Sequence, residues 1–162
     1  MQKGHSTYFI LLAVYTGART GAIMDLEWSQ IDLERRTIDF NKPDAEKTNK
    51  RRARIPIGRK LLGHLKRMKV TAGDETPYVF HQKRDKTRRI ISVVKGFRVA
   101  SKRAGFTDVT PHTLRHTCAS WMAQRGEKLI DASVYLNMSM PTLSKVYAHH
   151  NDEHIKELAD RF

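Results

Sequence analysis

Three side chains that can bind or protonate a phosphate stand close together near residue 115. His112, Arg115 and His116 follow Thr110 and Pro111, in the order expected at the start of a helix. Thr110 can accept a hydrogen bond from the first free N–H groups, and proline fits the first turn, where its missing N–H has no partner anyway. Free N–H groups and the positive end of the helix dipole both attract anions. This stretch therefore predicts a phosphate site, although an ordinary polar helix start can have the same residues.

At about 100° per residue, this helix divides into a polar face and an apolar face. The face predicted to stay accessible carries His112, Arg115, His116 and Ala119. The face predicted to be buried carries Leu114, Cys118, Trp121 and Met122. Because Cys118 is the single cysteine, no internal disulfide can form, and a core thiol in a reducing compartment is expected.

Further cations stand elsewhere in the chain. Gly17 ends an apolar helix predicted for residues 6–15, and Arg19 stands at the start of a second helix predicted for residues 20–27. Arg19 is then either a cation beside another helix N-terminus or an exposed loop residue. Residues 41–52 are predicted to form a polar loop with a basic end. A long lysine on this loop can reach into a groove, although most of its charges are expected to be solvated.

The charge balance points to a polyanionic partner. The 162 residues include 30 Lys and Arg against 17 Asp and Glu, a net charge of +13 that is concentrated between residues 42 and 103. A basic patch of this kind favours nucleic acid. The apolar run at 8–15 lacks the basic flank and the cleavage site of a signal peptide, and no run reaches the roughly 18 residues of a membrane span. No basic amphipathic helix with a bulky apolar face is present either, so a membrane partner is not expected.

The chain alternates helical and extended patterns over the length of about one domain. Short strands are predicted at residues 31–33, 37–40, 53–57 and 78–80. Further helices are predicted at 58–68, 90–103, 110–126 and 129–136 and after Pro141, and a last one at 152–162 is expected to dock on this chain or a neighbour. These patterns predict an α+β fold that is mainly α-helical, with helices around a small antiparallel β-sheet.

The order of these features resembles the catalytic domain of the tyrosine recombinases, the phage integrase family. Four blocks carry the resemblance over nearly the whole chain: Thr16-Gly17-Ala18-Arg19-Thr20-Gly21, the loop ending Ile55-Pro56-Ile57, Pro111-His112-Thr113-Leu114-Arg115-His116-Thr117, and Val146-Tyr147-Ala148-His149. The His-x-x-Arg-His block and a tyrosine at this distance are strong together, whereas each alone is weak. The resemblance implies the fold of the DNA breaking-rejoining enzymes and a site-specific recombinase or integrase acting on double-stranded DNA.

The resemblance also implies roles for particular residues. Arg19 and Arg115 match the family's two arginines, and two guanidinium groups can hold the nonbridging oxygens of a phosphodiester without a metal. Tyr147 matches the nucleophile that forms a 3′-phosphotyrosyl link, and His112 matches a base or hydrogen-bonding group. Because bond energy is kept in that link, the resemblance implies no ATP, no metal and no other cofactor.

Three positions leave the match open or depart from it. The lysine that protonates the leaving 5′ oxygen is best matched by Lys47, with Lys50 as the alternative, because the loop is longer than usual. Met138 stands at the third-block position, where histidine or tryptophan is usual, and a thioether can pack there but cannot donate a proton. Ala22 stands where the family often has a carboxylate, so the support of Arg19 is expected to differ.

Other classes of function stay open. Met138 and Ala22 also fit a DNA-binding module that has lost catalysis, and a type IB topoisomerase would use the same chemistry. Histidines four residues apart, at 112 and 116 and at 150 and 154, have a spacing that can bind zinc. Neither pair has a third ligand at motif spacing, so no metal site is predicted.

The remaining expectations concern the whole protein. Residues 1–162 are expected to be a catalytic-domain fragment that lacks the family's N-terminal helical domain. The resemblance implies a tetramer on DNA for the full-length protein, which is expected in the cytoplasm of a bacterium, with a bacterial or phage origin, near the nucleoid. Seven further cations are predicted to contact DNA: Lys50, Arg51, Arg52, Lys83, Arg84, Arg88 and Arg89.

Overall fold

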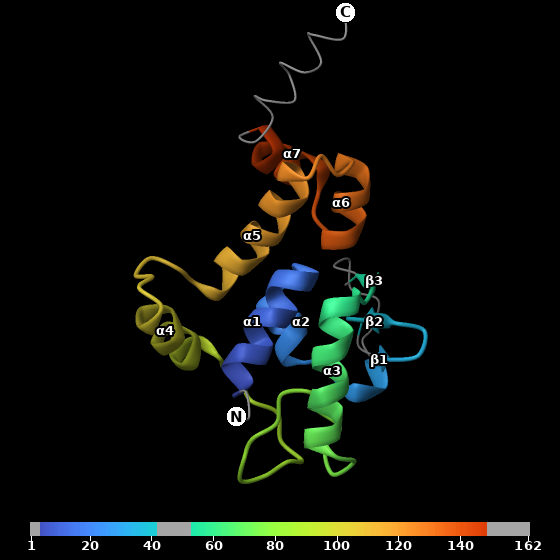
Figure 1. Cartoon of the computed structure of the whole chain (residues 1–162), viewed down its shortest axis with the longest axis vertical. Coiled ribbons are helices and arrows are strands. Elements are labelled where there is room, and N and C mark those ends of the chain that lie inside the picture. The colour runs from blue at the N-terminus through green and yellow to red at the C-terminus, as the bar shows by residue number, and fades with distance from the viewer. Residues whose placement is uncertain (1–3, 42–52, 149–162) are drawn as a thin grey trace, which may run out of the picture.

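One apolar helix, α1 (His5–Thr16), lies between the other helices in the computed structural model, which describes residues 4–41 and 53–148 (Figure 1). Apolar side chains cover most sides of α1, so it needs neighbours on several sides. These neighbours are α2 (Thr20–Met24), α3 (Arg59–Ala72), α4 (Val94–Arg103) and α5 (Pro111–Gln124). The C-terminal end of α1 and the start of α2 thereby lie close to α5.

A small antiparallel sheet follows α2 and a short 3-10 helix, Trp28–Gln30. Its strands are β1 (Ile31–Asp32), β2 (Thr37–Asp39) and β3 (Arg54–Pro56), in that order. Ile38 pairs with Ile31 on one side and with Ile55 on the other, and all three side chains are buried. The loop between β2 and β3 contains residues 42–52, which lie outside the described part of the chain.

Buried side chains form two clusters. The larger cluster lies among α1, α2, the sheet and α3, with Leu12, Ile23 and Leu65 fully buried. The smaller cluster comes from α5, α6 (Leu129–Leu136) and α7 (Met140–Ala148), and it consists of Cys118, Ala119, Ala132, Leu136 and Leu143. Because α5 packs against α1 as well as against α6 and α7, it connects the two clusters. Figure 1 shows α6 and α7 at the end of the molecule opposite the long loop after α3.

Most predicted elements are present with shifted ends. The helices predicted at 6–15, 58–68 and 110–126 are observed at 5–16, 59–72 and 111–124, and the helix predicted at 129–136 has those bounds. Thr110 stands at the predicted start of α5, where its N–H donates to the hydroxyl of Thr113 at 3.0 Å. The helix predicted at 152–162 lies outside the described residues. Within the described residues, no helix has the length and apolar character needed to cross a membrane.

Three predicted elements were wrong in extent. The helix predicted at 20–27 ends at Met24, because the following chain turns to meet a distant segment: the N–H of Trp28 donates to the carbonyl of Pro77 at 2.8 Å. The strand predicted at 78–80 is reduced to one bridge between Tyr78 and Glu27. The helix predicted from residue 90 begins at Val94, because residue 90 bonds instead to the carbonyl of residue 80.

The predicted faces of α5 were also wrong at three positions. Arg115 and Ala119, expected on the accessible face, are 4% and 0% exposed, whereas Trp121, expected to be buried, is 41% exposed. The buried stripe of α5 runs through Arg115, Cys118 and Ala119 because α1 lies against this side of the helix. A charged residue can lie within this stripe because its head group is hydrogen-bonded.

Gly17 ends α1 in the left-handed conformation, with φ +59°, and a β-carbon there would overlap the side chain of Leu136. We therefore predict that Gly17→Ala lowers the free energy of unfolding by about 2 kcal/mol or more, from backbone strain and overpacking together. Urea denaturation monitored by circular dichroism measures this change. Gly63→Ala, inside α3 where a β-carbon meets open space, is the control and should stabilise the protein by up to about 1 kcal/mol. Equal stability of Gly17→Ala and the unsubstituted protein would contradict this packing.

Candidate active site

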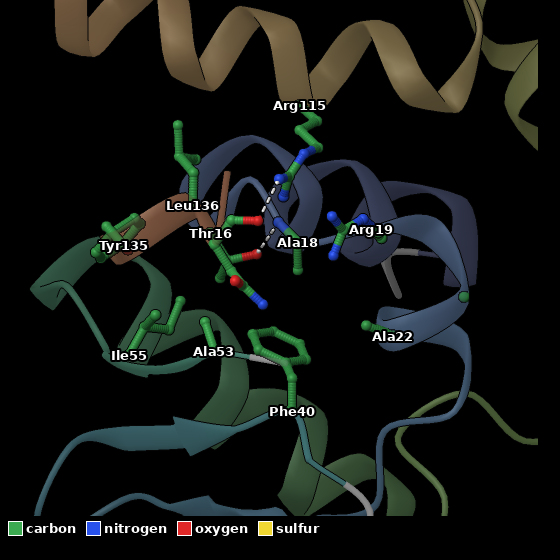
Figure 2. Close-up of a pocket in the computed structure, with 12 residues that line it drawn as sticks. Thr16, Ala18, Arg19, Ala22, Phe40, Ala53, Ile55, Arg115, Tyr135 and Leu136 are labelled. Carbon is green, nitrogen blue, oxygen red and sulfur yellow. Dashed lines mark hydrogen bonds between the residues drawn. The ribbon is translucent and has the colours of Figure 1, made fainter. Parts of the chain in front are cut away.

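A cavity of about 490 Å³ opens where the end of α1, the start of α2, the β2–β3 hairpin, α5 and the end of α6 meet (Figure 2). Its described lining consists of Thr16, Ala18, Arg19, Gly21, Ala22, Phe40, Ala53, Ile55, Arg115, Tyr135, Leu136 and Asn137. Figure 2 shows Arg115 extending from α5 toward Ala18, Arg19 beside it, and Phe40 and Ala53 across the cavity. The two arginines predicted to act together are therefore brought to one cavity.

Arg115 is buried at the wall of this cavity. Its Nη1 donates to the carbonyl of Gly17 at 2.5 Å, and its Nη2 donates to the carbonyl of Asn137 at 3.2 Å. Burial lowers the pKa of Arg115 to about 10, and the nearby charge of Arg19 contributes to this shift. A guanidinium with this pKa is still charged at neutral pH. The carbonyl oxygens compensate part of the cost of burying that charge.

Arg19 reaches the same cavity from the turn between α1 and α2. It is exposed and has an extended backbone, with φ −65° and ψ 144°. The turn before it is fixed by Thr16, whose hydroxyl donates to the carbonyl of Leu12 at 2.6 Å and accepts from the N–H of Ala18 at 3.2 Å. The neighbouring wall is the methyl group of Ala22, which is 6% exposed. No carboxylate stands at that position to neutralise Arg19.

The electrostatics of the cavity favour an anion. Its described lining contains two guanidinium groups and no Asp or Glu. Two arginines that converge without acidic partners repel each other, and an anion between them removes this repulsion. Guanidinium groups also match the geometry of phosphate oxygens with paired hydrogen bonds. The site is therefore suited to a phosphate group.

His112 lies in the first turn of α5, close enough to both arginines for their charges to act on it. Its exposed imidazole is 4.6 Å from that of His116, measured between ring centroids, with the rings at 88°. Burial lowers the pKa of His112 below the usual 6.5, and the charges of His116, Arg115 and Arg19 lower it further. His112 is therefore mostly neutral at pH 7, and a neutral imidazole can accept a proton. In the described part of the chain, no three His, Cys, Asp or Glu side chains gather in a way that could hold a metal ion.

Tyr147, like His112, is not among the described residues that line this cavity. Its side chain, near the end of α7, packs against the smaller cluster. The phenolic oxygen is shielded from solvent and has no hydrogen-bond partner among the described residues. Burial raises the pKa of the phenol above its usual 10, and Glu127 and Cys118 raise it further. In this structure the phenol therefore packs against the smaller cluster and is not part of the cavity lining.

Met138 occupies the position where a hydrogen-bonding side chain was expected from the family pattern. Its half-buried thioether packs against the same cluster as Tyr147. Its backbone is fixed by Ser133, whose carbonyl accepts from the N–H of Met138 at 3.1 Å and whose hydroxyl donates to the carbonyl of Met138 at 2.8 Å. Met138 therefore contributes packing near the end of α6.

The predicted loop lysine and three predicted DNA-contacting cations lie outside the described residues: Lys47, Lys50, Arg51 and Arg52. The ends of that loop are informative, because Phe40 on one side and Ala53 on the other both line the cavity. The described residues that flank this loop therefore lie across the cavity from the two arginines.

The other predicted DNA-contacting cations lie at the far end of α1. His81, which precedes them, contacts His5 at the start of α1, with ring centroids 5.2 Å apart. With 12 residues, α1 spans about 18 Å at 1.5 Å per residue. The loop after His81 is therefore separated from Arg115 by nearly the whole length of α1.

Two of these four cations are also paired with carboxylates. Arg89 contacts Asp25 at 2.7 Å, and Arg88 contacts Asp85 at 3.1 Å. The other two, Lys83 and Arg84, are exposed. Their role in DNA contact stays a prediction.

Sequence reasoning gave no site role to Tyr135 and Asn137, two of the described residues that line the cavity. The hydroxyl of Tyr135 donates to the carbonyl of Tyr15 at 2.9 Å and docks the end of α6 on the end of α1. Asn137 supplies one of the two carbonyls that hold Arg115. The single signal for Asn137 was its place in a predicted break between two helices, where asparagine is common in the left-handed conformation.

Fold and site together define a candidate phosphate-binding domain of the α+β class. The chain belongs to the phage integrase family, which it matches over residues 2–154. This match confirms the resemblance that the four sequence blocks indicated.

Named relatives agree with this assignment. Tyrosine recombinase XerA of Pyrococcus furiosus is 28% identical over 157 residues, which are 94% of this chain and 52% of the relative. The integrase of Salmonella phage P22 is 30% identical over 159 residues, which are 91% of this chain and 40% of the relative. The chain thus spans about half the length of these curated relatives.

Solved structures share the fold. A crystal structure of XerA recombinase matches with a TM-score of 0.72 and 22% identity, over 99% of this chain and 64% of that one. The Tn1549 transposon integrase, solved in complex with transposon right end DNA, matches with a TM-score of 0.78 and 17% identity, over 95% of this chain and 57% of that one. The predicted helical fold around a small antiparallel sheet is confirmed.

The environment of His112 generates a testable prediction. An NMR titration of its imidazole should give a pKa below 6.5, because burial and three neighbouring cationic or titratable groups disfavour the charged ring. Sulfate bound between the arginines should raise that pKa, because negative charge favours the imidazolium. Arg19→Gln should raise it as well. Arg125→Gln, which removes a charge at the opposite end of α5, should leave the titration unchanged. A titration insensitive to both sulfate and Arg19→Gln would place His112 outside the anion site.

Proposed function

We propose that this chain is the catalytic part of a site-specific DNA recombinase or integrase that cuts and rejoins strands through Tyr147. The observation that carries the proposal is the convergence of Arg19 and Arg115 on one cavity whose described lining has no carboxylate. Membership of the phage integrase family supports the reaction class. Cleavage by a tyrosine is phosphoryl transfer, so its transition state has charge on the nonbridging oxygens that two guanidinium groups can hold.

The proposed reaction balances without a metal or ATP. The Oη atom of Tyr147 attacks the phosphorus, a new P–O bond forms, and the bond to the 5′ oxygen breaks. The phenolic proton passes to His112, whose lowered pKa leaves it able to accept a proton, and the 5′ oxygen takes a proton from Lys47. Because one phosphoester replaces another, attack by a 5′ hydroxyl on the phosphotyrosyl link rejoins a strand, and both proton transfers reverse.

The place of Tyr147 adds a step to this proposal. Its half-buried side chain packs against the smaller cluster, where the pKa of the phenol is raised and its shielded hydroxyl has no hydrogen-bond partner among the described residues. We propose that the end of α7 must leave this cluster before the phenol can reach the phosphate between the arginines. DNA binding is the event proposed to favour that rearrangement.

Duplex DNA is the proposed substrate, and several copies of the longer protein are proposed to act on it together as a tetramer, in the bacterial cytoplasm. The net charge of +13 supports a polyanionic partner. Two proteins that share the fold were solved with DNA: the Tn1549 transposon integrase with transposon right end DNA, and XerH recombinase with palindromic difH substrate.

A DNA-binding module with impaired catalysis is the second candidate. The observations that favour it are the burial of the Tyr147 phenol and the thioether of Met138, which cannot hydrogen-bond a phosphate as a histidine would. Both candidates bind DNA, so a covalent adduct is what separates them.

Covalent capture tests the proposed function. The protein is incubated with a pool of duplexes of varied sequence, each nicked a few nucleotides from the varied region, so that the short cleaved fragment diffuses away. We predict adducts that survive denaturation in detergent, with mass spectrometry locating the DNA on Tyr147. Tyr147→Phe should give none, because it lacks the attacking oxygen. Tyr8→Phe, which alters a phenol packed against the larger cluster, should react like the unsubstituted protein. Adducts with Tyr147→Phe would show that the nucleophile is wrong, and no adduct with any duplex would favour the second candidate.

DNA binding should depend steeply on salt. Each phosphate contact by a cation releases counterions, so the logarithm of the association constant should fall linearly with the logarithm of salt concentration, with a slope of about −0.9 per contact. Arg19→Gln should reduce the size of that slope by about one. Fluorescence anisotropy of a labelled duplex measures both. Binding that is unchanged between low and moderate salt would contradict the electrostatic argument.

A further inference from the structure

Two helix ends meet at the guanidinium of Arg115. Its Nη1 donates to the carbonyl of Gly17, the residue after α1, and its Nη2 donates to the carbonyl of Asn137, the residue after α6. The C-terminal end of a helix has a partial negative charge, so both helix ends favour the positive charge of Arg115. The guanidinium is thereby held from two sides by parts of the chain that are far apart in sequence.

The left-handed backbone of both acceptors makes this arrangement possible. The φ angle is 59° at Gly17 and 46° at Asn137. A residue that continued its helix would direct its carbonyl along the helix axis toward the next turn. A left-handed residue ends the helix and turns the chain away, so its carbonyl leaves that direction. At Gly17 a side chain is excluded by Leu136, whereas Asn137 is a non-glycine residue that adopts the same conformation.

The end of α6 is fixed against the end of α1 by further contacts. Leu136 is fully buried and lies against Gly17. The hydroxyl of Tyr135 donates to the carbonyl of Tyr15 at 2.9 Å. These contacts set the distance between the two helix ends, so the two carbonyls of Gly17 and Asn137 form one rigid acceptor pair.

We propose that Asn137 is a positioning residue for Arg115, and that it acts through its left-handed backbone. The inference rests on the proposed function, in which Arg115 binds the scissile phosphate. A guanidinium has five N–H groups, and two are occupied by the carbonyls, which leaves three for phosphate oxygens. Two fixed acceptors set the plane and the rotation of the guanidinium, so the remaining groups point in one orientation. A misplacement of about 1 Å at such a site can reduce the rate about a hundredfold.

Two substitutions of Asn137 distinguish the effect of its backbone conformation from the effect of its side chain. Asn137→Gly keeps the left-handed conformation and removes the side chain, whereas Asn137→Val strains that conformation. In single-turnover cleavage of a captured duplex at saturating DNA, Asn137→Val should lower the rate constant about tenfold to a hundredfold. Asn137→Gly should stay within about threefold of the unsubstituted protein. Slow cleavage by Asn137→Gly would show that the side chain is what matters and would overturn the proposal.

Arg36 supplies a matched control for stability. It is the other described non-glycine residue with positive φ, at 54°, and its carbonyl accepts from the N–H of Ile57 at 2.7 Å rather than from Arg115. Arg36→Val therefore imposes a similar backbone strain without touching Arg115. It should lower the melting temperature to a similar degree and leave the cleavage rate constant unchanged. If Arg36→Val and Asn137→Val lowered the cleavage rate constant equally, general destabilisation of the protein would explain the loss, and the proposal would be overturned.

A double-substitution cycle then tests whether Asn137 acts through Arg115. A lysine at position 115 cannot bond both carbonyls with a planar fork. In the Arg115→Lys background, Asn137→Val should change the residual rate constant by less than about twofold. Fully additive losses would show that the two residues act independently and would overturn the proposal.

An NMR measurement decides the inference without catalysis. The side-chain N–H signals of Arg115, assigned by their loss in Arg115→Lys, should show slow rotation of both Nη groups in the unsubstituted protein and in Asn137→Gly. In Asn137→Val, faster rotation should average the side-chain N–H signals of Arg115. If circular dichroism shows that the valine variant is unfolded, Asn137→Ala is measured instead. Slow rotation that persists in the strained variant, or that is absent from the unsubstituted protein, would overturn the proposal. This NMR measurement needs no DNA, so its result does not depend on the proposed function. A failure of the proposed function would appear in the covalent-capture experiment instead, as the absence of adducts.

Discussion

The buried charge of Arg115 is the constraint on which the arrangement of the site depends. Removing a guanidinium from water is costly unless its N–H groups find acceptors, and here the acceptors are the carbonyls that follow α1 and α6. Three helices must therefore bring their ends to one point. The close contact of Gly17 with Leu136 and the hydrogen bond from Tyr135 to Tyr15 keep them there. A change in packing at this point therefore also changes the site.

The parts of the proposed reaction are divided between the two buried clusters. Arg19 belongs to the turn after α1, on the side of the larger cluster, whereas Tyr147 packs against the smaller one. Because α5 connects the clusters and carries His112 and Arg115, it is the element through which a rearrangement of α7 can affect the phosphate site. Both arginines line the cavity while the phenol lies outside it, so the proposed anion binding and the proposed attack involve separate parts of the structure.

The distribution of charge shows why net charge alone does not locate a binding surface. Basic residues between 81 and 89 contribute to the net charge of +13, yet three of them are paired: Lys86 with Glu75, Arg88 with Asp85 and Arg89 with Asp25. In the cavity, by contrast, two cations have no carboxylate in the described lining. An unneutralised pair of cations attracts a phosphate more strongly than a larger number of neutralised ones.

Patterns in the sequence determined the helix that begins after Thr110 and the family, because capping, periodicity and motif order can be read from the residues themselves. They also predicted which residues could bind a phosphate. The side of α5 that is buried depends on the rest of the fold. Arg115 is buried and Trp121 is exposed because of the position of α1, which the periodicity of residues within α5 does not reveal. The packing of Tyr147 against the smaller cluster, outside the cavity lining, likewise depends on how α7 packs against α5 and α6. The role proposed for Asn137 depends on the tertiary structure. Every residue has a backbone carbonyl, so the sequence does not show which one bonds Arg115, and the carbonyl of Asn137 reaches Arg115 only where the ends of α1 and α6 meet.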